Sequence, residues 1–279
     1  MIGCEREENN MEEYQVKEYQ HDPKKQRAYW NAAIGLQDVD GLKPSKYLYE
    51  LSEQNINGEL PIQTVQEKLG EYYRETSEPE RAETMECDIV SARIVELLSV
   101  GTVSLIPTAL KSIHRYLFEG IYDFAGQFRQ YNITKAESVL QGDTVKYANY
   151  FEIQDILQYD FETEKQQKYS KMNKEQIIQR LCAFSSSIWQ VHPFGEGNTR
   201  TTAVFMELYL NSIGFSVNND MFKEHSKYYR NALVRSNYAD FVKKVDTDFS
   251  FLEKFYGNLL FGEKHVLRND DMVVETKSF

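Results

Sequence analysis

The sequence predicts an all-α protein with one short exception in the middle of the chain. Apolar residues recur at three- or four-residue spacing in several windows, most clearly over residues 177–191. Residues that begin or end helices flank such windows, as Asp22-Pro23 and Gly214 do. Only residues 127–145 alternate loosely and combine β-branched with aromatic residues. We therefore expect a helical bundle with a β-hairpin flap at 127–145.

The N-terminal part of the chain divides into a tail and a small helical unit. Residues 1–20 are polar and rich in acids, so we expect a flexible tail. Residues 21–76 hold three helical windows separated by turn residues, which predicts a small N-terminal helical unit. Its helix boundaries follow from Pro23, Gly41, Pro44, Asn57, Gly58 and Pro61.

A polar segment with a proline, residues 77–84, marks the expected boundary to the main domain at 86–262. That domain begins with a window, residues 89–98, that is apolar on both sides of a helix. Pro107 opens the next helix, and helices resume after the flap. Residues 263–279 are predicted to be a C-terminal tail.

The composition excludes several partners. The 279 residues include 32 Lys and Arg against 43 Asp and Glu, a net charge of −11. We expect no binding to nucleic acid or to anionic membranes, because both attract a cationic surface. No apolar run reaches the length of a membrane span, and the acidic start does not resemble a secretory signal. Three scattered cysteines form neither a disulfide framework nor a metal motif, so we expect a soluble cytoplasmic protein.

The segment that carries chemistry is a helix, a short loop and a second helix. Asn173 and Gln176 form a predicted capping box that opens the first helix. His192 continues the inward stripe of this helix at its C-terminal end, directly before a proline. The loop then contains two glycines, and the second helix opens near Asn198. Because this second helix is apolar on most faces, we expect it to be central.

This arrangement predicts a local anion site on an acidic protein. Backbone N–H groups converge at the start of the second helix, beside its dipole and the guanidinium of Arg200. Glu196 offers an oxygen ligand for Mg²⁺, which commonly binds between one carboxylate and substrate phosphates. His192 can accept a proton from an attacking hydroxyl. Positioning, charge neutralisation and a base are what phosphoryl-type transfer requires.

Each of these residues also has a purely structural interpretation. A single His on an apolar stripe is more often a hydrogen-bonded core residue, Glu196 could satisfy the helix dipole, and Arg200 could pair with an acid. Their adjacency to one another and to the loop glycines favours a functional interpretation. The remaining histidines are expected to be structural or at the surface; they are His21, His114, His225 and His265.

Residues 192–200, HPFGEGNTR, closely resemble the active-site motif of the Fic family, HPFx(D/E)GNGRxxR. The run at 113–129, IHRYLFEGIYDFAGQFR, resembles the segment that leads into the flap of that family. The resemblance covers about residues 86–260 and implies a Fic-type helical bundle with a central helix-loop-helix active site. Fic enzymes mostly transfer AMP from ATP to a hydroxyl of a target protein. The resemblance therefore implies a protein adenylyltransferase with Mg²⁺ as cofactor and ATP as co-substrate.

The resemblance also implies roles for single residues. His192 would be the general base toward a Ser, Thr or Tyr hydroxyl, Phe194 would anchor the loop, and Glu196 would hold Mg²⁺. The phosphates would be bound by Gly195, Gly197, Asn198, Thr199 and Arg200. A flap at about 134–144 would dock the target segment by strand-like pairing, through Thr134, Lys135, Ala136, Glu137 and Ser138.

Two positions depart from the family motif. The glycine that follows Asn198 in the family is Thr199 here, and the second arginine of the family is Ala203. The loss of that arginine removes an expected γ-phosphate contact and could favour a nucleotide other than ATP.

The N-terminal unit resembles the antitoxin-like inhibitory module that restrains many Fic enzymes through (S/T)xxxE(G/N). At the matching place residues 36–41 read LQDVDG, with Leu36 for the hydroxyl residue and Asp40 for the glutamate. Because the second arginine is absent, we expect Asp40 to lack a guanidinium partner and to inhibit weakly. An ordinary turn at Asp40-Gly41 is an equal alternative, and residues 91–96 are a rival with spacing one residue too long.

Two other functions are left open beside adenylyl transfer. The departures at Thr199 and Ala203 suit a weakened enzyme that binds a nucleotide or a partner without transfer. A phosphotransferase of the same fold, similar to the Doc branch, is the third candidate. Self-association into a homo-oligomer is likewise open, and the sequence names no target protein.

Overall fold

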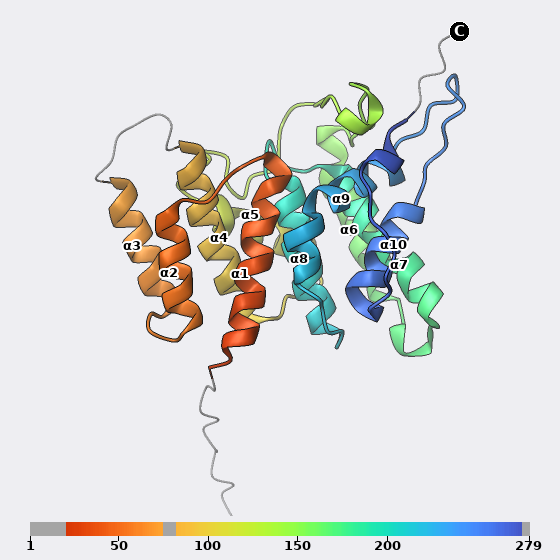
Figure 1. Cartoon of the computed structure of the whole chain (residues 1–279). Coiled ribbons are helices and arrows are strands. Elements are labelled where there is room, and N and C mark those ends of the chain that lie inside the picture. Colours follow the sequence, from red (N-terminus) through yellow and green to blue (C-terminus); the bar gives the residue numbers. More distant parts are fainter. Residues whose placement is uncertain (1–20, 75–81, 275–279) are drawn as a thin grey trace, which may run out of the picture.

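Within residues 21–74 and 82–274, which the computed structural model describes, the protein is all α-helical, as predicted (Figure 1). In this part of the chain the one β-type pairing is an isolated bridge between Asp240 and Val245. The α-helices of these residues are α1 (Pro23–Gln37), α2 (Lys46–Ile56), α3 (Ile62–Arg74), α4 (Ala82–Val100), α5 (Pro107–Phe118), α6 (Ile153–Lys165), α7 (Lys174–Val191), α8 (Asn198–Ser212), α9 (Asp220–Ser236) and α10 (Ser250–Phe261). Short 3₁₀ helices include η1 (Asp38–Asp40), η3 (Ser138–Leu140) and η6 (Asp270–Met272).

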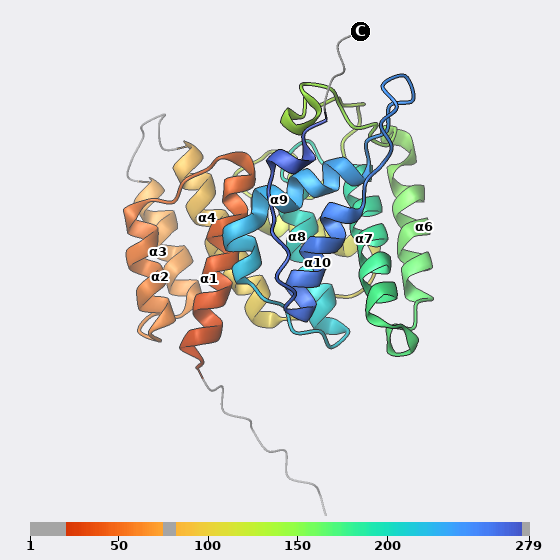
Figure 2. The same cartoon turned by 45° about the vertical axis from the view of Figure 1, so that its right-hand side comes forward.

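Helix α8 lies at the centre of the protein, as its apolar faces predicted. Helices α1, α4, α5 and α7 pack against it, and all residues from Asn198 to Leu210 are buried. In both views α1 to α4 lie on one side of α8, while α6, α7 and α10 lie on the other (Figure 2). The N-terminal end of α8 is therefore fixed in the core, and a site built there is held from several directions.

The N-terminal helices share the core of the rest of the protein. Helix α1 packs mainly against α4 and α9. Gly35 permits this close packing, since a Cβ atom there would lie 2.4 Å from the Cα atom of Lys223 in α9. Leu36 of α1 and Leu69 of α3 belong to the same buried cluster as the helices of the main body. Most of the predicted boundary, residues 77–84, falls outside the described residues, so the division into two units stays a prediction.

The predicted β-hairpin at 127–145 is wrong, because these residues form a loop without strands. Its tip is closed by η3, with the Gly142 N–H donating to Glu137 O at 3.0 Å. Across the tip the Glu137 N–H donates to Asp143 O, and other bonds reach distant parts of the chain: the Arg129 N–H donates to Pro193 O, and Val139 O in η3 accepts from the Val274 N–H. The β-branched residues thus reflect burial on the core, where Val139 lies, and not a ladder between the arms. We call residues 129–149 the flap segment.

The expected C-terminal tail is mostly exposed over its described part, residues 263–274, but two residues near its end are buried. Met272 in η6 is buried, and Val274 is both buried and bonded to the flap segment. The first expected tail, residues 1–20, lies outside the described residues. In the part of the chain that the structure describes, no helix is long and apolar enough to cross a membrane.

Candidate active site

His192 forms the C-cap of α7 and turns the chain toward the loop. Helix α7 begins with the predicted capping box, in which Asn173 and Gln176 each accept from the other's backbone N–H. His192 has left-handed backbone angles, φ 47° and ψ 59°, and its N–H donates to Trp189 O at 3.0 Å. The following residue, Pro193, cannot continue the helix. The left-handed turn therefore directs the next residues across the end of α8.

The imidazole of His192 is held in its neutral form. Burial, followed by the positive charge of Lys135, lowers the pKa of His192 to about 3. Its Nδ1 atom lies 3.3 Å from Trp189 O, so the Nδ1–H tautomer donates to that carbonyl. Among the described residues Nε2 has no hydrogen-bond partner, and the ring packs on Tyr147 at 4.3 Å between centroids. This tautomer leaves the Nε2 lone pair available to accept a proton.

The loop after His192 is anchored by aromatic stacking and by a second histidine. Phe194 is buried and stacks on His114 with 3.8 Å between ring centroids. His114 Nδ1 accepts from the Gly126 N–H at 2.9 Å, and its Nε2–H donates to Glu196 O at 3.0 Å. Burial lowers the pKa of His114 to about 4, which keeps this donor–acceptor pattern. His114 is thus structural, one of the two placements expected for it.

Asn198 closes the loop instead of presenting its amide to a ligand. Its Oδ1 accepts from the Phe194 N–H and its Nδ2 donates to Phe194 O, both at 2.9 Å. Gly197 lets the loop press on α5, because a Cβ atom there would lie 2.5 Å from the ring of Phe118. Gly195 faces Tyr131 and Phe124 in the same way, at 3.0 Å and more. The predicted phosphate-binding loop is therefore rigid, and its backbone N–H groups are what it offers to an anion.

The two residues that depart from the motif, Thr199 and Ala203, are both buried against other parts of the protein. The Thr199 hydroxyl accepts from the Trp189 Nε1–H at 2.9 Å, so it ties the start of α8 to the end of α7. Ala203 is fully buried within α8. The larger residue at position 199 therefore adds a buried hydrogen bond to the site.

The predicted absence of a guanidinium partner for Asp40 is wrong. Asp40 Oδ2 lies 2.9 Å from Arg200 Nε, and a second carboxylate, Glu86 in α4, accepts from the same guanidinium at 2.6 Å. Gln37 in α1 accepts a further hydrogen bond at 2.9 Å, and the Phe118 ring lies under the guanidinium at 4.8 Å. The prediction was based on the missing arginine at position 203. In the structure η1 instead places Asp40 beside Arg200, the first arginine of the motif. The alternative that Arg200 pairs with an acid is correct.

The flap segment divides into outward and inward residues. Thr134, Ala136 and Ser138 are exposed, and Lys135 is half-buried with its Nζ 3.7 Å from Glu196 Oε1. Glu137 is buried instead, where it accepts two hydrogen bonds from Arg230 and one from the Tyr147 hydroxyl. The five predicted docking residues therefore alternate between solvent and the site, and their role in docking a target stays a prediction.

Arg129 ties the flap segment to the end of α7, and sequence reasoning missed it. Its side chain donates to the carbonyl oxygens of Val191, His192, Tyr131 and Ala148, at 2.5 to 3.2 Å. Five further contributors were also missed: Gln37, Glu86, Tyr122, Tyr147 and Arg230. The run at 113–129 contained Tyr122 and Arg129, so that run was the available signal for those two. The other four lie far from the motif in sequence.

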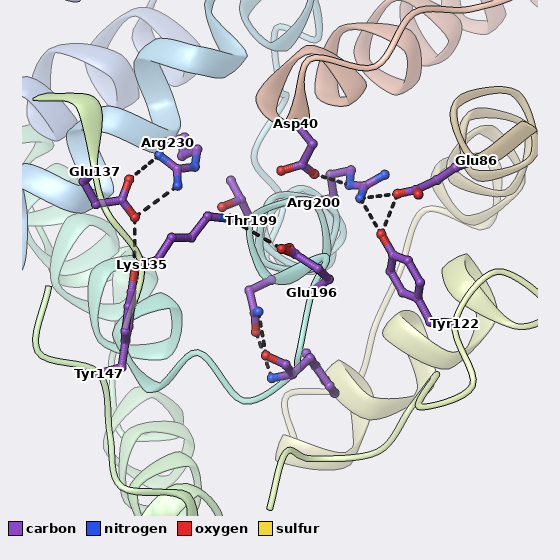
Figure 3. A network of polar contacts seen from close by, with 12 residues as sticks. Asp40, Glu86, Tyr122, Lys135, Glu137, Tyr147, Glu196, Thr199, Arg200 and Arg230 are labelled. Carbon is purple, nitrogen blue, oxygen red and sulfur yellow. Dashed lines mark hydrogen bonds and ion pairs between the residues drawn. The ribbon is translucent and has the colours of Figure 1, made fainter. Parts of the chain in front are cut away.

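A pocket of about 480 Å³ lies at the N-terminal end of α8, and Glu86, Tyr122 and Arg230 are among its lining residues (Figure 3). Four predicted site residues line it together: Asp40, Lys135, Glu196 and Arg200. Figure 3 shows Arg200 between Asp40 and Glu86 on one side, and Lys135 reaching toward Glu196 from the other. His192 is not among the lining residues, but the charges of Lys135 and Arg230 reach it. The site thus combines basic and acidic side chains with helix-terminal N–H groups, beside a neutral imidazole.

The carboxylates of this site fit a cation that is shared with phosphates. Within the described residues no group of three or more His, Cys, Asp or Glu side chains could hold a metal ion by itself. Glu196 is half exposed at the pocket. One carboxylate plus phosphate oxygens is the usual set for Mg²⁺, so the residues present are compatible with Mg²⁺ that arrives with a nucleotide.

Comparisons with known proteins point to one family. Residues 104–210 match the family model described as "Fic/DOC family". The chain is 24% identical over 182 residues to "Protein adenylyltransferase VbhT" of Bartonella schoenbuchensis, covering 60% of this chain and 37% of that protein. It is 27% identical over 130 residues to "Probable protein adenylyltransferase y4lH" of Sinorhizobium fredii, covering 47% of this chain and 64% of that protein. The chain thus spans less than two thirds of the length of either relative.

Among solved structures, a Fic family protein from Desulfovibrio desulfuricans G20 aligns with a TM-score of 0.49 and 13% identity. The alignment covers 85% of this chain and 63% of that one. The match of residues 104–210 to the family model confirms the predicted resemblance to the Fic family.

Proposed function

Because residues 104–210 form a Fic/DOC domain, we propose that this chain is a protein adenylyltransferase that transfers AMP from ATP to a hydroxyl of a target protein. The observation that carries the proposal is the placement of His192 between α7 and α8, with Nδ1 held on Trp189 O and Nε2 left to accept a proton. Two relatives named as protein adenylyltransferases support the same reaction class.

In the proposed reaction His192 Nε2 accepts the proton of a Ser, Thr or Tyr hydroxyl. The hydroxyl oxygen forms a bond to the α-phosphorus of ATP while the bond from that phosphorus to the bridging oxygen breaks. AMP is then attached to the target, and pyrophosphate leaves. A pKa of about 3 makes His192 a weak base in the free protein. The negative charge of bound phosphates raises the pKa of a nearby imidazole, so the base strengthens once ATP is present.

The rest of the pocket would neutralise the charge of the nucleotide. The free N–H groups and dipole of α8 attract phosphate, and the Arg200 guanidinium lies in the first turn of the same helix. Mg²⁺, held by Glu196, would supply charge neutralisation at the phosphates. In this proposal Gly195, Gly197 and Thr199 contribute backbone N–H groups, while Asn198 and Phe194 keep the loop in shape.

The N-terminal helices would restrain the enzyme through Asp40. Its carboxylate occupies one edge of the Arg200 guanidinium in the described structure, and a phosphate would compete for that edge. Asp40 is partly exposed, and Glu86 still pairs with the buried guanidinium when Asp40 leaves. We therefore assign Asp40 the inhibitory role and the N-terminal helices the role of an antitoxin-like module.

Intact-mass spectrometry of the full chain with Mg²⁺ and ATP tests this function. We expect an AMP-sized mass increase on the chain itself or on an added target, and its loss in His192→Ala. A base in this position accounts for about 10² to 10⁴ in rate, so the variant falls below detection. Unfolding of both proteins by urea is the control for folding. An adduct that forms equally in His192→Ala contradicts the proposed base.

A second candidate function is nucleotide binding without transfer. The double neutralisation of Arg200 by Asp40 and Glu86 and the buried alanine at position 203 favour it. This candidate predicts that ATP raises the melting temperature while no covalent product appears on any target. An adduct in the mass spectrum excludes it.

A further inference from the structure

The pocket at the start of α8 contains as many acidic as basic side chains. Lys135, Arg200 and Arg230 line it together with Asp40, Glu86 and Glu196. The formal charges of these side chains cancel. An anionic ligand therefore has to compete with a carboxylate for each cation, and the three cations differ in how firmly they are held.

Two of the three cations, Arg200 and Arg230, are held in ion pairs that include a buried side chain. The Arg200 side chain is 1% exposed and pairs with Asp40 and Glu86. Arg230 donates to both oxygens of Glu137, at 2.6 and 3.1 Å, and the Glu137 side chain is 1% exposed. Withdrawing Arg230 would leave that carboxylate buried and unpaired, which is costly. These arginines are therefore fixed parts of the site.

Lys135 is different, because both members of its ion pair reach solvent. Its Nζ lies 3.7 Å from Glu196 Oε1, and the side chains are 37% and 51% exposed. Such a pair contributes little to stability, so the ammonium can turn to a bound anion at small cost. The residue itself is placed by its backbone N–H, which donates to Thr144 Oγ1 at 3.1 Å.

Lys135 lies near both Glu196 and His192, the proposed Mg²⁺ ligand and the proposed base. Figure 3 shows its side chain extending from the flap segment across the end of α8 toward Glu196. On the other side its charge acts on His192, where it is the first cause after burial of the lowered pKa. The ammonium thus lies within electrostatic reach of both the proposed base and the proposed Mg²⁺ ligand. A polyphosphate bound at α8 would lie between these groups.

We propose that Lys135 contacts the phosphates of the nucleotide and makes the pocket select a nucleoside polyphosphate over a monophosphate. This inference rests on the proposed function, because it requires a nucleotide in this pocket. It adds that the flap segment binds the nucleotide as well as facing the target. Lys135 is then the cation that can move to the nucleotide, because Arg200 and Arg230 are already paired with carboxylates.

Isothermal titration of the full chain with ATP and with AMP, both with Mg²⁺, tests the proposal. The proteins are the wild type, Lys135→Ala, Lys135→Arg and Lys146→Ala. Lys146 is the matched control, an exposed lysine of the same flap segment that does not line the pocket. One lost charge-assisted contact corresponds to roughly ten-fold in affinity. We expect Lys135→Ala to lose about that factor for ATP and to bind AMP as the wild type does, with the other two variants unchanged.

The outcomes separate this inference from the proposed function. If Lys135→Ala binds ATP as tightly as the wild type, the inference is overturned and the proposed function stands. If ATP and AMP lose affinity equally, Lys135 does not distinguish a polyphosphate from a monophosphate, and the inference fails again. If neither the wild type nor Asp40→Asn binds any nucleotide, the proposed function fails and the inference fails with it.

Discussion

The two sides of the pocket at α8 differ in how deeply their ion pairs are buried. On one side Arg200 is buried and held by Asp40, Glu86, Gln37 and the Phe118 ring, which come from η1, α4, α1 and α5. On the other side Lys135 extends from a loop and meets Glu196 in partial solvent exposure. Stability is concentrated on the Arg200 side, whereas adaptability lies with Lys135. The proposed function requires both, since a nucleotide has to be bound, converted and released.

The largest expected difference concerns stability. Arg200→Gln removes a cation whose side chain is 1% exposed, while its partners Asp40 and Glu86 are 25% and 16% exposed. Because solvent reaches both carboxylates, we expect a loss at the lower end of the range for a broken buried pair, about 3 kcal/mol. Lys135→Gln removes an exposed pair, which is worth about 0 to 1 kcal/mol. Urea unfolding of the two variants against the wild type measures both values. Equal losses of unfolding free energy would contradict the claim that the Arg200 side contributes more to stability than the Lys135 side.

The buried histidines give the fixed part of the site a pH dependence. Burial lowers the pKa of His114 to about 4 from an ordinary value of 6.5. Between these values the unfolded chain binds a proton that the folded chain does not, so the free energy of unfolding falls as the pH falls from 6.5 toward 4. A shift of this size corresponds to about 3 kcal/mol, at order-of-magnitude precision.

His114→Gln is expected to show a shallower decline over the same range in urea titrations at several pH values. Glu207 acts in the opposite direction, since burial raises its pKa to about 8 and its contribution falls as the pH rises from 4.5 to 8. The variant and the wild type both contain Glu207, so their difference at each pH isolates His114. A decline of equal slope in both would contradict the assignment to His114.

The last prediction concerns ATP affinity and tests whether Asp40 is inhibitory. Asp40→Asn keeps the shape of η1 but removes the negative charge beside Arg200, so phosphate no longer competes with a carboxylate there. We expect ATP to bind about ten-fold more tightly, the worth of one charge-assisted contact. Titration calorimetry measures this affinity, and Asp38→Asn is the matched control in the same 3₁₀ helix. Unchanged ATP affinity in Asp40→Asn would remove Asp40 from the inhibitory role.

The parts of the site that depend on neighbouring residues were predictable from sequence. The capping box at Asn173, the end of α7 at His192 and the start of α8 at Asn198 follow from local preferences, and the structure has all three. The central place of α8 followed from its apolar faces. These features need no knowledge of distant segments.

The parts that depend on distant residues were not predictable. Asp40 meets Arg200 across 160 positions, and Arg230 meets Glu137 from another helix, so no spacing or periodicity reveals either pair. The flap segment misled the strand prediction because burial on a helical core selects the same β-branched residues as a sheet does. Sequence patterns report the local environment of a residue, whereas the charge balance of the pocket is a property of the fold.

The central claim is that this chain transfers AMP with His192 as the general base, and labelled ATP tests it most directly. The full-length Asp40→Asn protein is incubated with Mg²⁺ and ATP that carries ³²P at the α or at the γ position, with Asp40→Asn/His192→Ala alongside. We predict protein-bound label from α-labelled ATP only, and its loss in the double variant. Label from γ-labelled ATP would instead show phosphate transfer, and α label that persists without His192 would contradict its role as the base.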